Sequence, residues 1–131
     1  MSRIKARESC FKLIFEYHFL KQKNEITLEE FLGEKDIEAT DKDYLVNLYE
    51  GIISKDEELS SLIESHLVNY TLSRITKIDL SILKVAIYEL KYLNEKPAVV
   101  INEAVELSKR YSNDNSYKFV NGLLANIVKG E

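Results

Sequence analysis

The chain has 131 residues, of which 45% are hydrophobic and 31% charged, and its formal net charge is −4. This length suits one domain with a compact core, and the composition is typical of a folded soluble protein and not of a disordered one. Four glycines and one proline are too few for a β-sandwich or barrel, which needs a turn about every ten residues. An all-α fold is therefore the leading class.

Several other classes of protein are excluded by what the sequence lacks. No apolar run approaches the roughly 18 residues of a membrane span, and no signal peptide opens the chain. A single cysteine allows no internal disulfide, which fits the reducing cytoplasm. Cys10, His18 and His66 are too far apart for a structural zinc site, and the glycines are too scattered for a phosphate-binding loop. We therefore expect a cytoplasmic protein that is not an enzyme, with no metal and no cofactor.

Apolar residues recur at the three- and four-residue spacing of amphipathic helices in seven segments. The predicted helices run from Ser2 to about Lys21, Thr27 to Gly33, Asp41 through Ile53, Leu59 through Leu67, Ile78 through Leu93, Pro97 to Tyr111, and Asn115 or Ser116 through Ile127. Ser2 and Asp41 are predicted N-caps, and Thr27 opens a capping box with Glu30. The short connections predict a compact seven-helix bundle, with sub-bundles of three and four helices as one arrangement.

Three residues inside these helices need an explanation. Asn121-Gly122 usually signals a hairpin turn, but here it interrupts no helical period, so we expect Gly122 to allow the close approach of another helix. Cys10 and His18 lie on apolar helical faces, and we interpret them as core residues, not as a nucleophile and a catalytic base.

Charge is distributed unevenly along the chain. Residues 1–23 carry a net charge of +4, whereas residues 24–66 carry −10. Arg3, Lys5, Arg7 and Lys12 crowd the first turns of the first helix, where cations oppose the helix dipole. Such a cluster gains affinity for a phosphate backbone by releasing counterions. The segment therefore predicts a nucleic-acid contact or, on composition alone, a solvated helix end.

A second cluster lies at the start of the last helix. Tyr117-Lys118-Phe119 combines two rings with an ammonium group, directly after the polar loop at residues 112–116. Single-stranded RNA is held by ring stacking together with cationic contacts to phosphate. The helical period by itself favours a core position for Phe119, so both interpretations stay open.

Four segments stand out in order along nearly the whole chain: residues 3–8 (RIKARE), 78–90, 100–109 and 118–124. Together they resemble the NusB family of transcription antitermination factors. Residues 78–90 (IDLSILKVAIYEL) are similar to the long central helix of that family. Residues 100–109 (VINEAVELSK) are close to its most distinctive segment, and residues 118–124 (KFVNGLL) to a third signature. Arg3 through Glu8 resembles its basic first helix. The acidic middle of the chain resembles the family least.

The resemblance implies that residues 1–131 form one NusB-like, RNA-binding helical domain. It implies a partner, the ribosomal protein NusE, with which the chain would bind the boxA element of ribosomal RNA leader transcripts. It further implies membership of an antitermination complex on RNA polymerase and a role in ribosome biogenesis. The RNA contacts expected from the resemblance and the basic start are Arg3, Lys5, Arg7, Lys12, Asn115, Lys118 and Phe119. The resemblance places Phe15 and Asp79 at the protein-partner interface.

The sequence departs from the family pattern at several of these positions. Ile4 and Ala6 interrupt a run that often holds adjacent arginines, so the first helix would bind RNA more weakly and depend more on the partner. Phe15 stands where tyrosine is common, and Leu80 where a basic residue is common. Asn115 replaces a frequent acidic residue, which removes a negative charge beside the expected RNA surface.

Two alternatives remain open at this point. The chain could be a helical scaffold that binds protein only, without RNA binding of its own. NusB-like domains also precede the catalytic domain of some ribosomal RNA cytosine methyltransferases, but no cofactor-binding segment follows here, so we expect no free-standing methyltransferase. A monomer and a homodimer are both compatible with the sequence.

Overall fold

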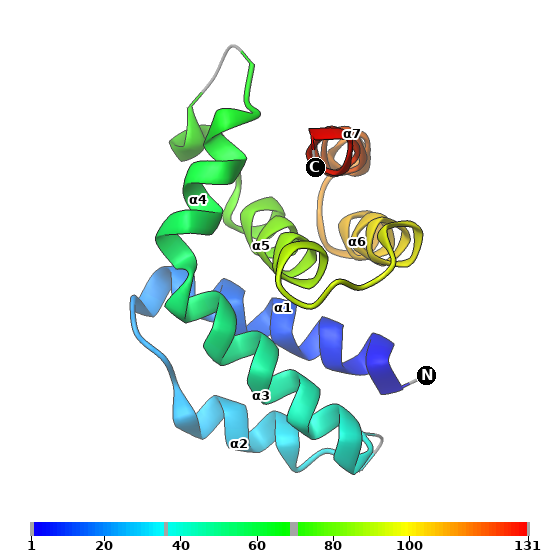
Figure 1. The fold of residues 1–131 in the computed structure, drawn as a ribbon. Coiled ribbons are helices and arrows are strands. Elements are labelled where there is room, and N and C mark those ends of the chain that lie inside the picture. Colours follow the sequence, from blue (N-terminus) through cyan, green and yellow to red (C-terminus); the bar gives the residue numbers. More distant parts are fainter. Residues whose placement is uncertain (1, 36, 69–70, 131) are drawn as a thin grey trace.

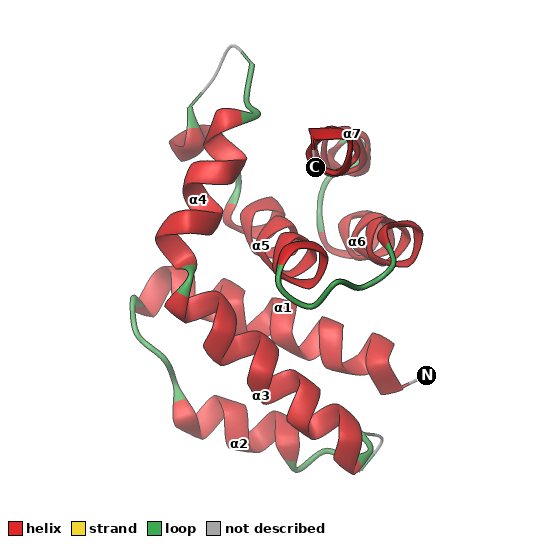
Figure 2. Cartoon of the chain, viewed as in Figure 1, coloured by secondary structure: helices red, strands yellow, loops and turns green. Residues whose placement is uncertain are grey.

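The structure, a computed structural model, describes residues 2–35, 37–68 and 71–130. All regular secondary structure in these ranges is helical (Figure 2). Seven α-helices in the described residues confirm the predicted all-α class, and a 3-10 turn, η1, lies between the fourth and the fifth. In chain order the elements are α1 (Ser2–Leu20), α2 (Glu25–Leu32), α3 (Ala39–Ser54), α4 (Asp56–Ser65), η1 (Leu72–Arg74), α5 (Lys77–Lys91), α6 (Pro97–Tyr111) and α7 (Ser116–Gly130).

Helix α2 begins two residues before the predicted start. Its N-cap is Asn24, whose side chain accepts hydrogen bonds from the backbone N–H of Ile26 at 3.0 Å and of Thr27 at 3.2 Å. The capping box at Thr27 is therefore wrong, and the Thr27 hydroxyl instead donates to Glu16 Oε2 at 3.0 Å. Gly33 ends the helix, as predicted.

Two predicted N-caps, at Asp41 and Ser2, and the predicted end of the fourth helix can be compared with the structure. Helix α3 begins at Ala39, so Asp41 lies in its first turn and is not the N-cap. Helix α4 ends at Ser65, two residues before the predicted end at Leu67. The cap expected from Ser2 depends on a side chain that lies outside the described residues.

Helix α5 lies at the centre of the molecule (Figure 1). It packs against α1, α3, α4, α6 and α7, and nine of its 15 residues are buried. Ile82, Leu83 and Ile87 are at most 1% exposed, and burying each such side chain stabilises the fold by about 1.5–3 kcal/mol. Helices α1–α3 lie in the lower part of Figure 1 and α4–α7 in the upper part, like the predicted groups of three and four helices, but α5 also packs on α1 and α3 across this division.

Close helix approach occurs at a different glycine from the one predicted. A Cβ atom built at Gly122 meets nothing within 4 Å in the described part of the chain. A Cβ atom at Gly51 would instead overlap the hydroxyl end of Tyr88, across the contact between α3 and α5. The Tyr88 ring is held in place by Tyr92, with their centroids 5.1 Å apart. The prediction for Gly122 is wrong because Gly122 lies on the exposed side of α7, and a glycine in a helix does not by itself show where a second helix approaches.

Replacing each of these glycines with alanine tests this difference. Gly51→Ala should destabilise the protein by about 1–3 kcal/mol, because the added methyl group forces Tyr88 from its packed position. Gly122→Ala should stabilise it by about 0.5–1 kcal/mol, since alanine is the better helix former and has room. Urea unfolding of both variants measures these changes, and equal shifts in the same direction would contradict the packing described here.

Candidate nucleic-acid interface

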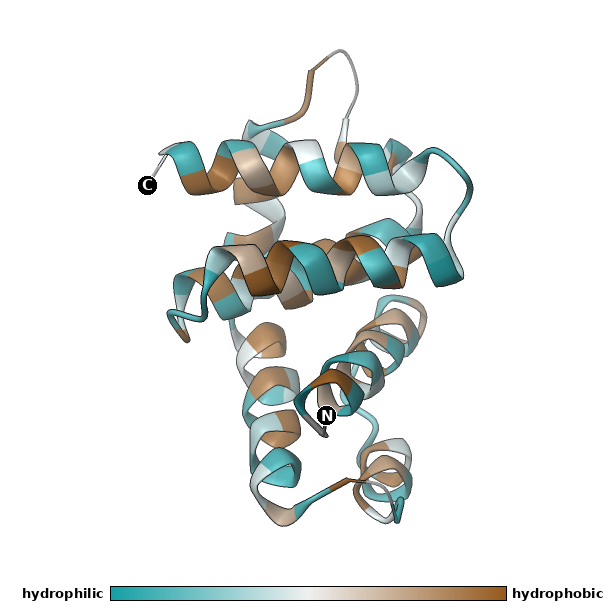
Figure 3. Cartoon of the chain, turned by 90° about the vertical axis from the view of Figure 1, so that its right-hand side faces the viewer, coloured by the Kyte–Doolittle hydropathy of each residue, from teal (hydrophilic) through white to brown (hydrophobic). Residues whose placement is uncertain are grey.

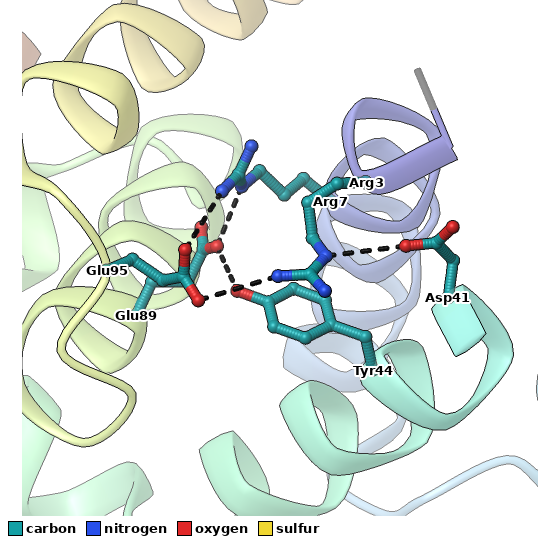
Figure 4. Close-up of polar contacts among 6 residues, drawn as sticks. All are labelled: Arg3, Arg7, Asp41, Tyr44, Glu89 and Glu95. Atoms are coloured by element: carbon teal, nitrogen blue, oxygen red, sulfur yellow. Dashed lines mark hydrogen bonds and ion pairs between the residues drawn. The ribbon is translucent and has the colours of Figure 1, made fainter.

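Arg7, expected to contact RNA, is instead buried in the protein core. Its side chain lies between α1 and α5, where Nε donates to Glu89 Oε2 at 2.7 Å (Figure 4), and only 4% of the residue is exposed. Tyr44 donates to the same carboxylate oxygen. Burial alone would lower the pKa of Arg7, but the charge and hydrogen bond of Glu89 outweigh it and the pKa is raised. The expectation for Arg7 is therefore wrong: its guanidinium forms an internal ion pair.

The neighbouring cations Arg3 and Lys5 are also paired with carboxylates. Arg3 lies over the Tyr44 ring, 3.7 Å from its centroid, with its guanidinium between Asp41 and Glu95 at 3.3 and 3.5 Å (Figure 4). Lys5 Nζ lies 3.2 Å from a carboxylate oxygen of Glu34, in the loop after α2.

Two of the three carboxylates that pair with Arg3 and Lys5, Asp41 and Glu34, belong to the acidic segment at residues 24–66. That middle segment folds against the basic start, so charges that are separated along the sequence neutralise each other in space. Arg3 and Lys5 are thereby left with weaker fields toward an RNA strand than their number suggests.

Lys12 has a different environment from the three cations before it. It is exposed on α1, with Nζ 5.8 Å from the ring centroid of Tyr111 at the end of α6. Tyr111 also packs on Phe11, with centroids 5.1 Å apart. Glu8 accepts hydrogen bonds from Arg110 and from the Tyr111 hydroxyl, both at 2.7 Å. Lys12 is thus placed beside a second cation and a ring from α6.

The loop between α6 and α7 brings the second predicted cluster to the same corner of the molecule. Asn113 shapes this loop, since its Oδ1 accepts from the N–H of Asn115 at 3.1 Å and its carbonyl from that of Ser116 at 3.1 Å. Asn115 and Lys118 are exposed at the start of α7. Phe119 is half-buried and packs against the core, as its helical period suggested.

We call the described residues 110–119 the α6–α7 corner. With Lys12 from α1, they bring cations, amides, rings and the carboxylate of Asp114 to one short loop. The loop between α6 and α7 is coloured as hydrophilic in Figure 3. Arg110 and Tyr111 were not predicted from the sequence as members of this cluster. The signal was available, because a basic residue and a ring directly precede the loop, but the helical period of Tyr111 assigned it to packing.

Asp79, expected at the partner interface, mainly holds this corner in place. It is 6% exposed, and its Oδ1 accepts from the Ser112 hydroxyl at 2.9 Å. The Ser112 and Ser116 hydroxyl oxygens form a further hydrogen bond at 2.8 Å. Asp79 in the first turn of α5 therefore ties the end of α6 to the start of α7.

Phe15, the other expected interface residue, belongs to an aromatic surface at the end of α1. It is half-buried and packs edge-on against Phe19, with centroids 5.0 Å apart. Phe19 is 58% exposed, and Lys77 Nζ at the start of α5 lies 5.2 Å from its ring centroid. Exposed rings of this kind are enriched at protein–protein contacts.

His18, near the end of α1, is buried and has a hydrogen-bond partner at each ring nitrogen. Its Nε2 is 3.1 Å from Lys84 Nζ, and its Nδ1 is 3.0 Å from Ser81 Oγ. An ammonium group can only donate, so Nε2 accepts and Nδ1 carries the proton. Lys84 also donates to Asp56 Oδ1 at 2.5 Å. Burial and the charge of Lys84 lower the pKa of His18 to about 4, so this cluster needs a neutral imidazole.

The described residues contain no group of three His, Cys, Asp or Glu that could hold a metal ion. No helix in that part of the chain has the length and apolar character needed to cross a membrane. Cys10 is fully buried in the core, as expected.

Comparison with known families and proteins gives a consistent result. The NusB family matches residues 4–129 of the chain. The "Transcription antitermination protein NusB" of Acetivibrio thermocellus is 38% identical over 130 residues, covering 98% of this chain and 90% of that protein. The protein of the same name from Listeria monocytogenes is 38% identical over 129 residues, covering 98% of this chain and 97% of its own length.

Two solved structures share the fold. T. maritima NusB has a TM-score of 0.90 and 33% sequence identity, covering 98% of this chain and 92% of that one. A crystal structure of the antitermination factors NusB and NusE in complex with double-stranded RNA contains a chain with a TM-score of 0.86 and 29% identity, and the match covers 100% of both chains.

The buried position of Arg7 leads to a prediction about stability. Arg7→Ala should destabilise the protein by about 3–5 kcal/mol, because it leaves Glu89 buried without its cation. Lys12→Ala, an exposed position on the same helix, should change the free energy of unfolding by less than about 0.5 kcal/mol. Urea unfolding of both variants provides the measurement. A fully stable Arg7→Ala protein with reduced RNA affinity would restore Arg7 to the RNA-binding surface.

The His18 cluster leads to a prediction about pH. Unfolded His18 takes up a proton below pH 6.5, whereas the folded protein resists protonation until about pH 4. The free energy of unfolding should therefore fall by ~3 kcal/mol as the pH drops from 6.5 to 4. Above pH 6.5 the full contribution of neutral His18 is present. His18→Gln should flatten this dependence, and His66→Gln should keep it because His18 remains. Urea unfolding across the pH series gives the slopes; identical slopes in both variants would exclude His18 as their source.

Proposed function

Because this chain belongs to the NusB family of transcription antitermination factors, we propose that it binds boxA RNA together with the ribosomal protein NusE. The observation that carries this proposal is the α6–α7 corner, where the exposed Lys12 and Lys118 lie near Tyr111 and the loop that follows it, beside Arg110 in its ion pair with Glu8. A chain in the crystal structure of NusB and NusE with double-stranded RNA also has the fold of this protein. The bound pair would act within an antitermination complex on RNA polymerase, in the cytoplasm, and support ribosomal RNA transcription and ribosome biogenesis.

Local charge, and not the net charge of −4, sets the interaction with RNA. Lys12 and Lys118 supply cations to phosphates, while Tyr111 and Phe119 offer ring surface to bases. The side-chain amide of Asn115 can both donate and accept hydrogen bonds. Arg3 and Lys5 face carboxylates, so in our proposal they act as weaker, peripheral contacts that RNA reaches only by competing with Asp41, Glu95 and Glu34.

The partner surface adjoins the RNA surface on the same helix. Lys12 and Phe15 lie three residues apart on α1, so they are neighbours on its exposed side. We assign direct contact with NusE to Phe15 and Phe19, and an indirect role to Asp79 through Ser112. A protein held beside the RNA site raises the effective concentration of the RNA, so that two modest contacts combine into tight binding.

One observation favours a second candidate function, that of a scaffold binding protein only. Arg3, Lys5 and Arg7 are all paired with carboxylates, which removes most of the cationic field of the first helix. A scaffold would bind NusE through the aromatic surface and leave RNA to the partner. The two functions differ in whether cations at the α6–α7 corner affect RNA affinity.

Charge reversal at the corner tests the proposal. Lys12→Glu and Lys118→Glu should each weaken binding to a boxA-containing RNA about tenfold in the presence of NusE. Each should also reduce by about one the number of counterions released on binding, which is read from the slope of log affinity against log salt concentration. Fluorescence anisotropy at two salt concentrations provides both quantities.

The control is Lys129→Glu, an exposed lysine at the other end of α7, which should leave the affinity nearly unchanged. Omission of NusE should weaken RNA binding of the unsubstituted protein. Unchanged RNA affinity in both corner variants, with NusE binding intact, would identify the protein as the scaffold.

A further inference from the structure

A groove runs along the outer side of the α6–α7 pair, adjoining the corner. It has a volume of about 510 Å³ and is open to solvent, within the ~300–1,000 Å³ range of sites for small organic ligands. Both helices line it, and they lie side by side on the face shown in Figure 3. Its lining residues are Ala98, Ile101, Asn102, Val105, Lys109, Tyr117, Lys118 and Asn121.

The chemistry of the groove combines a ring, amides and cations. Lys109 Nζ lies 5.1 Å from the ring centroid of Tyr117, so an ammonium group already borders the face of an accessible aromatic ring. Asn102 and Asn121 supply amide donors and acceptors that match the edges of nucleobases. Ala98, Ile101 and Val105 add an apolar floor suited to a flat ring.

The charge in the groove is positive. Of the residues that line it in the described chain, the charged ones are Lys109 and Lys118. Glu106 lies 4.0 Å from Lys109, but both side chains are about half exposed, with 51% and 53% accessible. A pair of this kind contributes little and is easily exchanged for a phosphate.

Lys118 belongs both to the groove and to the α6–α7 corner, so the two surfaces are continuous. We propose that this groove binds single-stranded RNA flanking the boxA element. One base stacks on Tyr117, and the adjoining phosphates lie against Lys109 and Lys118. This inference rests on the proposed function, because the RNA must first be held at the corner. In this proposal the protein contacts nucleotides beyond the boxA element.

An acidic peptide is the other occupant that two lysines could attract. The ring and the two amides favour RNA, because stacking and edge contacts use all three groups, whereas an acidic segment would need only the lysines. The experiment therefore includes an arm that detects a protein in the groove.

The test compares two RNAs bound to the full chain together with NusE. One RNA contains only the boxA element, and the other adds four unpaired nucleotides on each side. The extension should raise the affinity about fivefold, the effect of one stacked base at the lower end of its range. Lys109→Glu, in the groove but outside the corner, should abolish this gain while binding the short RNA as the unsubstituted protein does. Lys129→Glu, on α7 outside the groove, should keep the gain.

The outcomes separate this inference from the proposed function. If the short RNA fails to bind in the presence of NusE, the proposed function fails and this inference with it. If the short RNA binds but the extension adds nothing, or if Lys129→Glu also removes the gain, only the groove is excluded.

A second measurement keeps the test independent of affinity. Photo-crosslinking of 4-thiouridine in the flanking nucleotides should label a peptide containing Lys109 or Tyr117. Labelling elsewhere on the chain, or amide shifts at the groove caused by NusE without RNA, would overturn the assignment.

Discussion

The burial of α5 is the constraint on which the other parts of this structure depend. This helix is covered by five others, yet it carries four buried polar side chains: Asp79, Ser81, Lys84 and Glu89. A buried polar group without a partner costs about 1–3 kcal/mol, and a charged one costs more. Glu89 takes its partner from Arg7 near the start of α1, and Ser81 takes His18 near its end. Because these contacts lie at opposite ends of both helices, they fix the antiparallel register of α1 on α5.

That register decides which side of α1 remains available for binding. With Arg7 and His18 turned inward, Lys12 lies beside Tyr111, and Phe15 and Phe19 follow along the exposed side. The proposed RNA and protein surfaces therefore adjoin on one rigid helix. Two weak contacts that adjoin on one helix can reinforce each other, because binding at one raises the effective concentration at the other.

Helix α5 also fixes the remaining part of the proposed RNA surface. Asp79 accepts from Ser112, and this contact sets the direction in which α7 leaves the loop. The corner and the groove next to it are thus held from within by a carboxylate that is almost inaccessible. Polar groups buried for structural reasons determine where the exposed cations and rings are displayed.

The helical class and the helices of the described residues follow from the sequence, because apolar spacing reports directly which face of a helix is buried. The central position of α5 was implied only by the resemblance to the NusB family. The roles of individual cations did not follow. Arg3, Lys5 and Arg7 looked alike as a basic run, but their partners Asp41, Glu34 and Glu89 are 29 to 82 residues away along the chain. Likewise, Gly51 and Gly122 are equivalent in a helical pattern, and only the contact between α3 and α5 distinguishes them. Local periodicity specifies a helix and its buried face; the pairing of charges and the fit of surfaces arise when distant segments pack together.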